Sequence, residues 1–397
     1  MEFKFYITPV LNRQPDGTPI YADEIDITRY VSSSAASIKR EIDAGINDIG
    51  LYGFGRVRLS LINFDGLFNN PFPFADGRSI FTEQGRDLAK VRMAAIDGGN
   101  EFDVFNGLVS DLDADQTLID HTVSLTVLGL DSILKKVAVT GGVILTGATI
   151  SSTIKRLLDR PAIKSVLNVD FNNITVGNDT EIDNNEVFFG LDTKEALDLL
   201  LLASASVLVV DADGNVIVQG RGANDNTPHA FYGAFDPQER GNIISITNVS
   251  NGIARAFNRI VIDKQVIDSQ KHIIRYGLRK KELGDVKEFI TNVERRQRVG
   301  IALISAFAEP KMEMRLTIPF DRDRDIKMLD GVTVDNPLYA PPAPGQEPTY
   351  YEASAYDSGN YHQARNSLLV KPDVLFKVIG IEHRLKDNLT ILRLRQE

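Results

Sequence analysis

The residues best suited to chemistry are three aspartates at alternate positions, Asp111, Asp113 and Asp115. Carboxylates at this spacing open the Ca²⁺ loops of EF-hand proteins, which need a glycine at the sixth position and a glutamate at the twelfth. Those two positions hold Gln116 and Thr122, so the set of calcium ligands is incomplete. The ligand pattern therefore gives a calcium site little support.

The other signatures of catalysis are also incomplete. The sequence contains neither the HExxH pattern of zinc hydrolases nor the GxSxG pattern of serine hydrolases. The glycine-containing runs at 50–55 and 141–147 miss the spacings of nucleotide-binding loops, and they predict turns. Paired carboxylates for glycoside hydrolysis stay open, because their separation is set in three dimensions. The five histidines are scattered along the chain: His121, His229, His272, His362 and His383. We expect a non-enzymatic protein without a cofactor or metal.

The composition is that of a soluble protein with a sizeable core. The chain has 397 residues, of which 43% are hydrophobic and 25% charged, so about two to four domains are expected. It contains no cysteine, which excludes disulfides and thiolate metal sites. Its net charge of −10 disfavours a general nucleic-acid binder. The short basic runs at 279–281 and 294–298 predict solvated faces or salt bridges between subunits.

No targeting signal or membrane span is expected. The N-terminal run MEFKFYITPVL alternates apolar and polar residues, which predicts a first strand rather than a signal peptide. The longest apolar run, at 197–210, is too short to cross a bilayer. We expect the protein to be cytosolic when made.

The stretch from Asp26 to Pro71 predicts the scaffold of a first domain. A short strand at 25–31 leads into a Ser/Ala segment and the charged run SIKREID. Alternating residues at 57–62 then predict a half-buried antiparallel strand, which ends in the turn-forming run NFDGLFNNP. A strand pair at 91–95 and 102–110, a turn-rich acidic segment, a strand at 121–128 and a short helix at 130–136 complete a β-rich domain over residues 1–136.

Residues 137–204 predict a small α+β domain. A helix at 151–160 has a start signal at Ser151-Ser152 and ends at Pro161. Short strands are expected over the Asn/Asp-rich residues 166–190, and a second helix follows with Thr193 as its N-cap. The run SVLVVDADGNVIVQGR predicts a β-hairpin, with a tight type I′ turn at Asp213-Gly214.

The rest of the chain predicts a second β domain. Residues 205–284 open it with strands that include 272–278, residues 285–310 form a helix that Pro310 ends, and residues 311–397 supply further strands. The Pro- and Tyr-rich residues 337–367 predict a long exposed loop, either an interface or a disordered surface segment.

In their order, these pieces resemble the tail hub (baseplate hub) proteins of tailed bacteriophages. The likeness rests on ITRYVSSSAASIKREID…GRVRLSLINFDGLFNNP, then FDVFNGLVSDLDADQTLIDHTVSLTVLGLDSIL, and then the helix and hairpin of 193–219. NRIVID, the helix at 289–310 and the final FKVIGIEHRL…LTILRLR follow in the same order. The resemblance spans nearly the whole chain, and the 161–190 and 337–367 segments depart from it.

The resemblance implies an α+β fold, predominantly antiparallel β, with two tube-protein-like β-barrels that carry helical and loop insertions. It implies a homotrimer at the virion tail tip that continues the tail tube, contacts distal tail and tube proteins, and carries central fibre or receptor-binding proteins. Its channel would pass the tape-measure protein and the DNA without specific binding. The alternative is a secreted β-rich carbohydrate-active enzyme or binding module, which a secretion signal, a Trp-lined groove or a Cys framework would favour, and all three are absent.

Three candidate surfaces follow, two from the resemblance and the third, the tyrosine-rich loop, from its composition at 337–367, because tyrosine is enriched at interfaces. The three aspartates named first are the candidate channel lining. The candidate subunit interface comprises Lys39, Arg40, Glu41 and Asp43. The candidate partner-binding loop comprises Tyr350, Tyr351, Tyr356 and Tyr361.

Overall fold

The computed structural model shows two compact units, each formed from two separate stretches of the chain. Unit 1 comprises Met1–Ala223 and Arg255–Glu309, and unit 2 comprises Asn224–Ala254 and Pro310–Glu397. The structure describes the following residues: 2–32, 38–42, 50–69, 79–81, 88–116, 121–220, 229–232, 242–250, 252–320, 326–335, 374–384 and 387–396. The predicted boundaries at residues 136 and 204 fall inside unit 1, and the five-part division stays a prediction.

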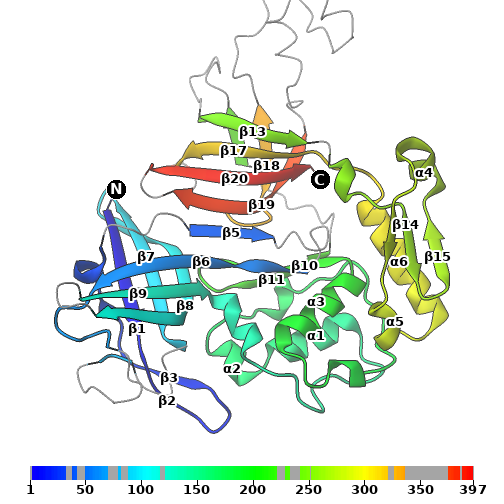
Figure 1. Ribbon diagram of the computed structural model, residues 1–397. Helices are drawn as coiled ribbons and strands as arrows, with labels where there is room; N and C mark the ends of the chain where they lie inside the picture. Colours follow the sequence, from blue (N-terminus) through cyan, green and yellow to red (C-terminus); the bar gives the residue numbers. More distant parts are fainter. Residues whose placement is uncertain are drawn as a thin grey trace, which may run out of the picture. The chain divides into compact units, whose positions relative to one another are not determined.

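Unit 1 begins with a twisted, mainly antiparallel sheet in the order β5-β6-β9-β8-β7-β1-β4 (Figure 1). Its strands are β1 Glu2–Thr8, β4 Ile25–Asp26, β5 Ile38–Ile42, β6 Gly50–Ile62, β7 Lys90–Asp97, β8 Asn100–Gln116 and β9 His121–Gly129. A hairpin of β2 Val10–Arg13 and β3 Pro19–Tyr21 follows β1. Alternate residues such as Phe5, Leu59 and Leu125 are buried on one face of the sheet, as a half-buried strand requires.

Three predictions for this sheet are wrong in detail. Gly50–Gly55 lie inside β6 and make no turn, and the acidic residues 111–116 continue β8 as a strand. A 3-10 turn, η1 (Thr28–Tyr30), replaces most of the strand expected at 25–31. Strand pairing outweighs the low strand propensity of glycine and aspartate here, because residues 50–53 pair with β5 and with residues 207–208, and residues 111–116 pair with β9.

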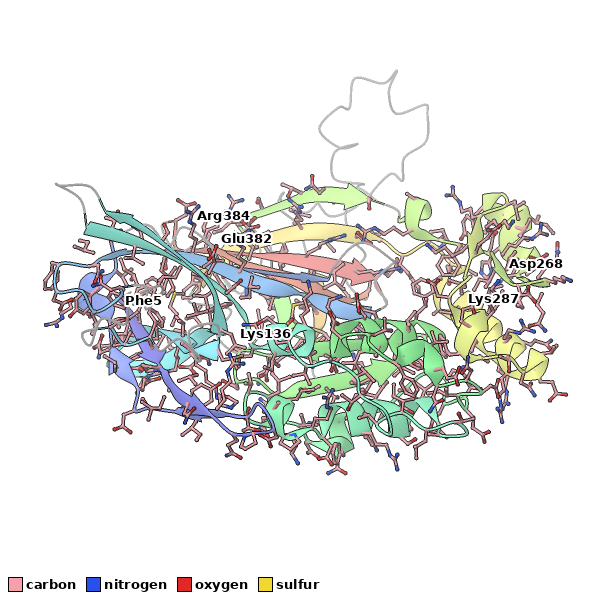
Figure 2. All side chains as sticks on the ribbon, turned by 60° about the horizontal axis from the view of Figure 1, so that its bottom comes forward. Phe5, Lys136, Asp268, Lys287, Glu382 and Arg384 are labelled. Atoms are coloured by element: carbon pink, nitrogen blue, oxygen red, sulfur yellow. The ribbon has the colours of Figure 1, made fainter. Side chains whose placement is uncertain are left out.

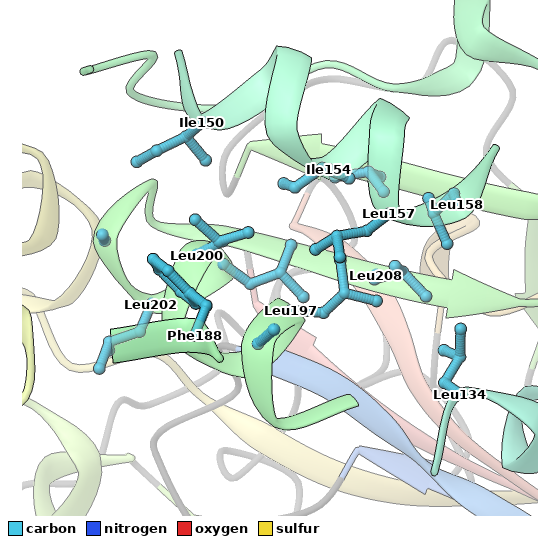
Figure 3. Close-up of a cluster of buried hydrophobic side chains, with 14 of the residues drawn as sticks. Leu134, Ile150, Ile154, Leu157, Leu158, Phe188, Leu197, Leu200, Leu202 and Leu208 are labelled. Carbon is cyan, nitrogen blue, oxygen red and sulfur yellow. The ribbon is translucent and has the colours of Figure 1, made fainter. Parts of the chain in front are cut away.

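A helical layer packs on the hairpin of β10 (Ser206–Val210) and β11 (Val216–Gly220) in unit 1. It contains α1 Ile150–Leu158, α2 Pro161–Lys164, α3 Thr193–Ala203 and the 3-10 turns η4 Leu130–Lys135, η5 Phe171–Asn173 and η6 Glu186–Phe188. Figure 3 shows the apolar stripe of α1 facing α3 and β10. The central residues are fully buried: Ile150, Ile154, Leu157, Leu158, Phe188, Leu197, Leu200 and Leu208.

Side-chain caps set the starts of these helices, and they differ from those predicted. The Thr149 side chain caps α1 and accepts from Ser152 N at 3.3 Å. Asp192, not Thr193, caps α3, because it forms a capping box with Glu195. The short strands expected at 166–190 are 3-10 turns and single bridges instead, since side chains satisfy the backbone of this Asn/Asp-rich segment.

The 206–220 hairpin is confirmed, but its turn is longer than a type I′ turn. Val210 pairs with Val216, which leaves five residues in the loop. The Asp211 carboxylate accepts from Asp213 N and Asn215 N, each at 2.9 Å, and Gly214 takes a positive φ of 81°. A side-chain acceptor therefore organises this turn, as is typical of an Asx turn.

Residues 255–309 complete unit 1 with a small sheet and three helices. The sheet has the order β15-β14-β16, with β14 Arg259–Ile262, β15 Gln265–Asp268 and β16 Lys280–Glu282. The helices are α4 Gln270–Tyr276, α5 Val286–Phe289 and α6 Val293–Phe307. Helix α6 covers one face of the sheet, and Gly300 permits the close approach, since a Cβ there would lie 2.6 Å from Ile267 Cδ1.

Two predictions for this segment are wrong. The strand expected at 272–278 is helix α4, which Gly277 ends at a φ of 75°. The single helix expected at 285–310 is two helices, because Asn292 adopts an extended backbone and its side chain caps α6. The β-branched pair Ile273-Ile274 favours a strand, but in the structure the segment closes as a helix, where Gly277 N donates to Ile273 O.

The described strands of unit 2 form a sheet in the order β13-β17-β20-β19-β18-β12, and among them only β12 and β18 pair in parallel. Its strands are β12 His229–Tyr232, β13 Ser245–Ser250, β17 Glu313–Pro319, β18 Gly331–Asp335, β19 Leu375–Arg384 and β20 Leu389–Gln396. On β19, Glu382 and Arg384 lie two positions apart on one face and form an ion pair at 3.0 Å (Figure 2). The prediction of an α+β fold with mainly antiparallel sheets is confirmed.

Candidate functional site

Within the Asp26–Pro71 stretch, η1 and residues 63–68 form a corner at the end of β6. The Tyr30 side chain is buried, and its hydroxyl donates to Asp65 Oδ2 at 2.6 Å. This bond raises the pKa of Tyr30 and lowers that of Asp65, because it favours the protonated phenol beside an ionised carboxylate. Phe68 packs edge-on against the Tyr30 ring, and Phe68 N donates to Asn63 Oδ1 at 3.0 Å. This part of the chain therefore serves as scaffold, because these contacts join η1 to the residues that follow β6.

The candidate subunit interface lies on β5. Lys39, Arg40 and Glu41 belong to this strand, and Lys39 is the Cα partner of Arg56 on β6. Asp43 lies outside the described residues. The structure thus places three of the four residues on one strand of unit 1, and their role in an interface stays a prediction.

The candidate channel lining lies on β8. Asp111, Asp113 and Asp115 are all in this strand, and the Asp111 side chain is exposed. A β-bulge between Val109 and Asp111 precedes them. Their Cα partners on β9 are short hydroxyl residues: Thr126, Ser124 and Thr122. The strand brings the three positions into one alternating row, which turn geometry would not do.

The candidate partner-binding loop lies outside the described residues. This applies to all of 336–373 and so to Tyr350, Tyr351, Tyr356 and Tyr361. Its binding role stays a prediction.

Sequence reasoning missed a polar cluster on the sheet of unit 1, centred on Arg92 of β7. The guanidinium forms paired bonds of 3.0 and 2.9 Å with the Glu24 carboxylate, and single bonds of 2.8 and 2.9 Å with Glu101 and Asp103. It also lies 4.0 Å from the centre of the Tyr6 ring, whose hydroxyl donates to Glu101 at 3.0 Å. These residues come from four separate places in the sequence, so only the strand register brings them together.

The electrostatics of this cluster follow from its one cation and three carboxylates. The bond to Glu24 is the main reason that the pKa of Arg92 is raised, while the Arg92 bond lowers the pKa of Glu101. Burial and the Glu101 bond raise the pKa of Tyr6. Arg92, Glu101 and Tyr6 therefore stay in their ordinary charge states near neutral pH, which suits an acidic surface patch rather than a general acid or base.

The described residues contain no group of three or more His, Cys, Asp or Glu side chains that could hold a metal ion. The histidine side chains that the structure describes have local partners. These pairs are His229 with Asp330 at 3.1 Å, His272 with Ser269 at 2.6 Å and His383 with Thr390 at 3.0 Å. These three histidines thus contribute hydrogen bonds at three separate places in the fold.

No helix among the described residues has the length and apolar character needed to cross a membrane.

Comparison with known proteins identifies the fold. No family model matches the sequence, and no curated protein matches it. The structure is similar to that of the tail protein from Neisseria meningitidis, with a TM-score of 0.55 and 12% identity, over 100% of this chain and 97% of that one. It is also similar to the 43 kDa tail protein of prophage MuSo2 from Shewanella oneidensis, with a TM-score of 0.50 and 12% identity, over 99% and 98% of the two chains. The resemblance to tail hub proteins is therefore confirmed at the level of the fold: from end to end, the chain has the fold of these tail proteins.

Proposed function

We propose that this chain is a structural, non-enzymatic component of a phage tail tip, a hub that assembles into a ring and continues the tail tube. The observation that carries the proposal is the likeness of fold over the whole chain to two tail proteins. The two mainly antiparallel sheets, one in each unit, are consistent with two tube-like parts per copy. Three copies would then present six such parts around one axis, which matches a six-fold tube.

The candidate surfaces take defined roles in this proposal. Lys39, Arg40 and Glu41 on β5 would face the neighbouring copy. The aspartate row of β8 would line the channel, where negative charge lets DNA and the tape-measure protein pass without sticking. Distal tail proteins and a central fibre or receptor-binding protein would occupy the outer surfaces, and the tyrosines of 337–367 are the proposed contact.

The experiment is to measure the mass of the purified protein by light scattering and to view it by negative-stain microscopy. We expect a trimeric ring with a central opening, formed by the chain alone or once a tail-tube protein is added. A chain that stays monomeric under both conditions would contradict the proposal. So would robust turnover of a glycan or peptide that is lost on changing one carboxylate.

A further inference from the structure

Large apolar side chains are exposed to solvent on helix α4 and just after it. None of its residues is buried, and Ile274 is 84% exposed. Leu278, just after the helix, is 55% exposed. Lys271 is three residues from Ile274 and four from Arg275, so Lys271 neighbours both of these side chains on one side of the helix. We call these four residues the basic patch, since it combines cationic and apolar groups as interaction surfaces do.

The charge around the basic patch stands out against the rest of the chain. Residues 264–281 contain six Lys and Arg and one Asp, a net charge of +5 in a chain of net charge −10. The single acid, Asp268, is held by Arg259 through two bonds of 2.7 Å; Figure 2 labels Asp268 at the end of β15. The cations of α4 itself are therefore not neutralised by this carboxylate.

A segment of opposite charge lies elsewhere in unit 1. Residues 179–195, here called the acidic segment, contain six Asp and Glu and one Lys, a net charge of −5. Arg295 binds two of its acids, Glu181 and Asp183, from within the same copy. Glu186 is exposed, and the nearby Phe189 side chain is 45% exposed. The acidic segment thus combines negative charge with an aromatic anchor.

The two surfaces lie at opposite ends of α6. At its first turn, Asn292 N donates to Asp183 of the acidic segment at 2.8 Å. At its last turn, Phe307 O accepts from Phe257 N, and the adjacent Asn258 donates to Gly277 O, which ends α4. Figure 1 shows α4 and α5 at opposite ends of α6. A helix of 15 residues is about 22 Å long, well beyond the screening length of about 8 Å in physiological salt.

We propose that the basic patch of one copy docks on the acidic segment of a second copy, around Glu186 and Phe189. The two surfaces are complementary in charge, and each supplies apolar groups for the other. They cannot reach each other within one copy, so the contact is head-to-tail, and such contacts close into rings when the rotation between copies allows it. The inference rests on the self-assembly proposed above and names the residues that bring it about.

The test exchanges the charges of the two surfaces. Variant K271E/R275E and variant E186K change only exposed side chains, and each is expected to weaken self-association by about tenfold or more, the factor that 1.4 kcal/mol produces. The combined variant K271E/R275E/E186K should regain assembly, because every contact between its copies pairs a reversed patch with a reversed acid, also in a ring of three. Sedimentation velocity over a concentration series measures both effects, and thermal melting checks that each variant is folded.

The matched control is K155E/R156E on α1, which makes the same change in net charge away from the basic patch and should assemble like the wild type. If K271E/R275E and E186K also assemble like the wild type, the inference is wrong while the proposed function stands. If each variant loses assembly and the combined variant K271E/R275E/E186K does not regain it, the two surfaces do not pair with each other, which also overturns the inference. A wild type that stays monomeric alone and with tail-tube protein would overturn both.

Discussion

Helices α1 and α4 contain similar residues, but α1 buries its isoleucines and α4 does not. Both are short and combine isoleucine with Lys and Arg. In α1, Ile150 and Ile154 are fully buried, while in α4 no residue is buried and Ile274 is 84% exposed. The stripe of α1 faces α3 and β10, which complete its core. The comparison teaches that an apolar stripe serves folding in one helix and remains available for association in the other.

The largest effect on stability should come from the buried core that α1 shares with α3. Leu197→Ala in α3 removes a fully buried side chain that faces α1. We expect the free energy of unfolding of unit 1 to fall by about 3 kcal/mol, since the substitution loses apolar burial and leaves a cavity. Urea denaturation followed by circular dichroism measures it. Leu11→Ala, at a side chain 59% exposed, is the control, and equal losses for both variants would contradict the buried role of α3.

An intermediate effect should come from the start of α3. Asp192→Ala removes the acceptor for Glu195 N, a bond of 2.8 Å, and breaks the capping box. We expect a loss of about 1 kcal/mol in the free energy of unfolding, the usual value for a helix N-cap. Asp192→Asn keeps an acceptor and should lose much less. If the Asn and Ala variants are equally unstable, the charge matters and the cap does not.

The smallest effect on stability should come from α4. Ile274→Ser changes a side chain that contributes little to any core, so the free energy of unfolding should stay within about 0.5 kcal/mol of the wild type. Self-association should nevertheless weaken, because the basic patch loses its most exposed apolar group. Urea denaturation and sedimentation velocity on the same samples separate the two effects. If Ile274→Ser unfolds easily but assembles normally, Ile274 serves the fold rather than association, which would contradict the distinction drawn between α1 and α4.

Much of the fold could be predicted from local patterns. The alternation at 57–62, the hairpin at 206–220 and the helix at 193–203 all appear in the structure. The failures lie where a local pattern is overridden by the helix signals beside it or by pairing with another strand. Ile273-Ile274 favoured a strand but belongs to a helix, and the acidic residues 111–116 suggested turns but form part of a 17-residue strand.

The candidate surfaces were less predictable than the fold. The positions of Lys39 and Asp111 in strands follow from the sequence pattern only in part, and their roles stay predictions. The Arg92 cluster had no signal in the sequence, because its partners are 68, 9 and 11 residues away. Strand register alone places these groups within hydrogen-bonding distance, and register depends on which strands pair.

The sequence by itself determined the class of fold and much of the order of the elements, and it placed the starts of α1 and α3 to within two residues of their caps. It also determined the two oppositely charged segments, since charge is a property of composition. Only the tertiary structure decided that these segments lie at opposite ends of α6 and that Ile274 is exposed while Ile154 is buried. The physical reason is that burial and charge pairing depend on distances between residues far apart in the chain, which no local pattern encodes.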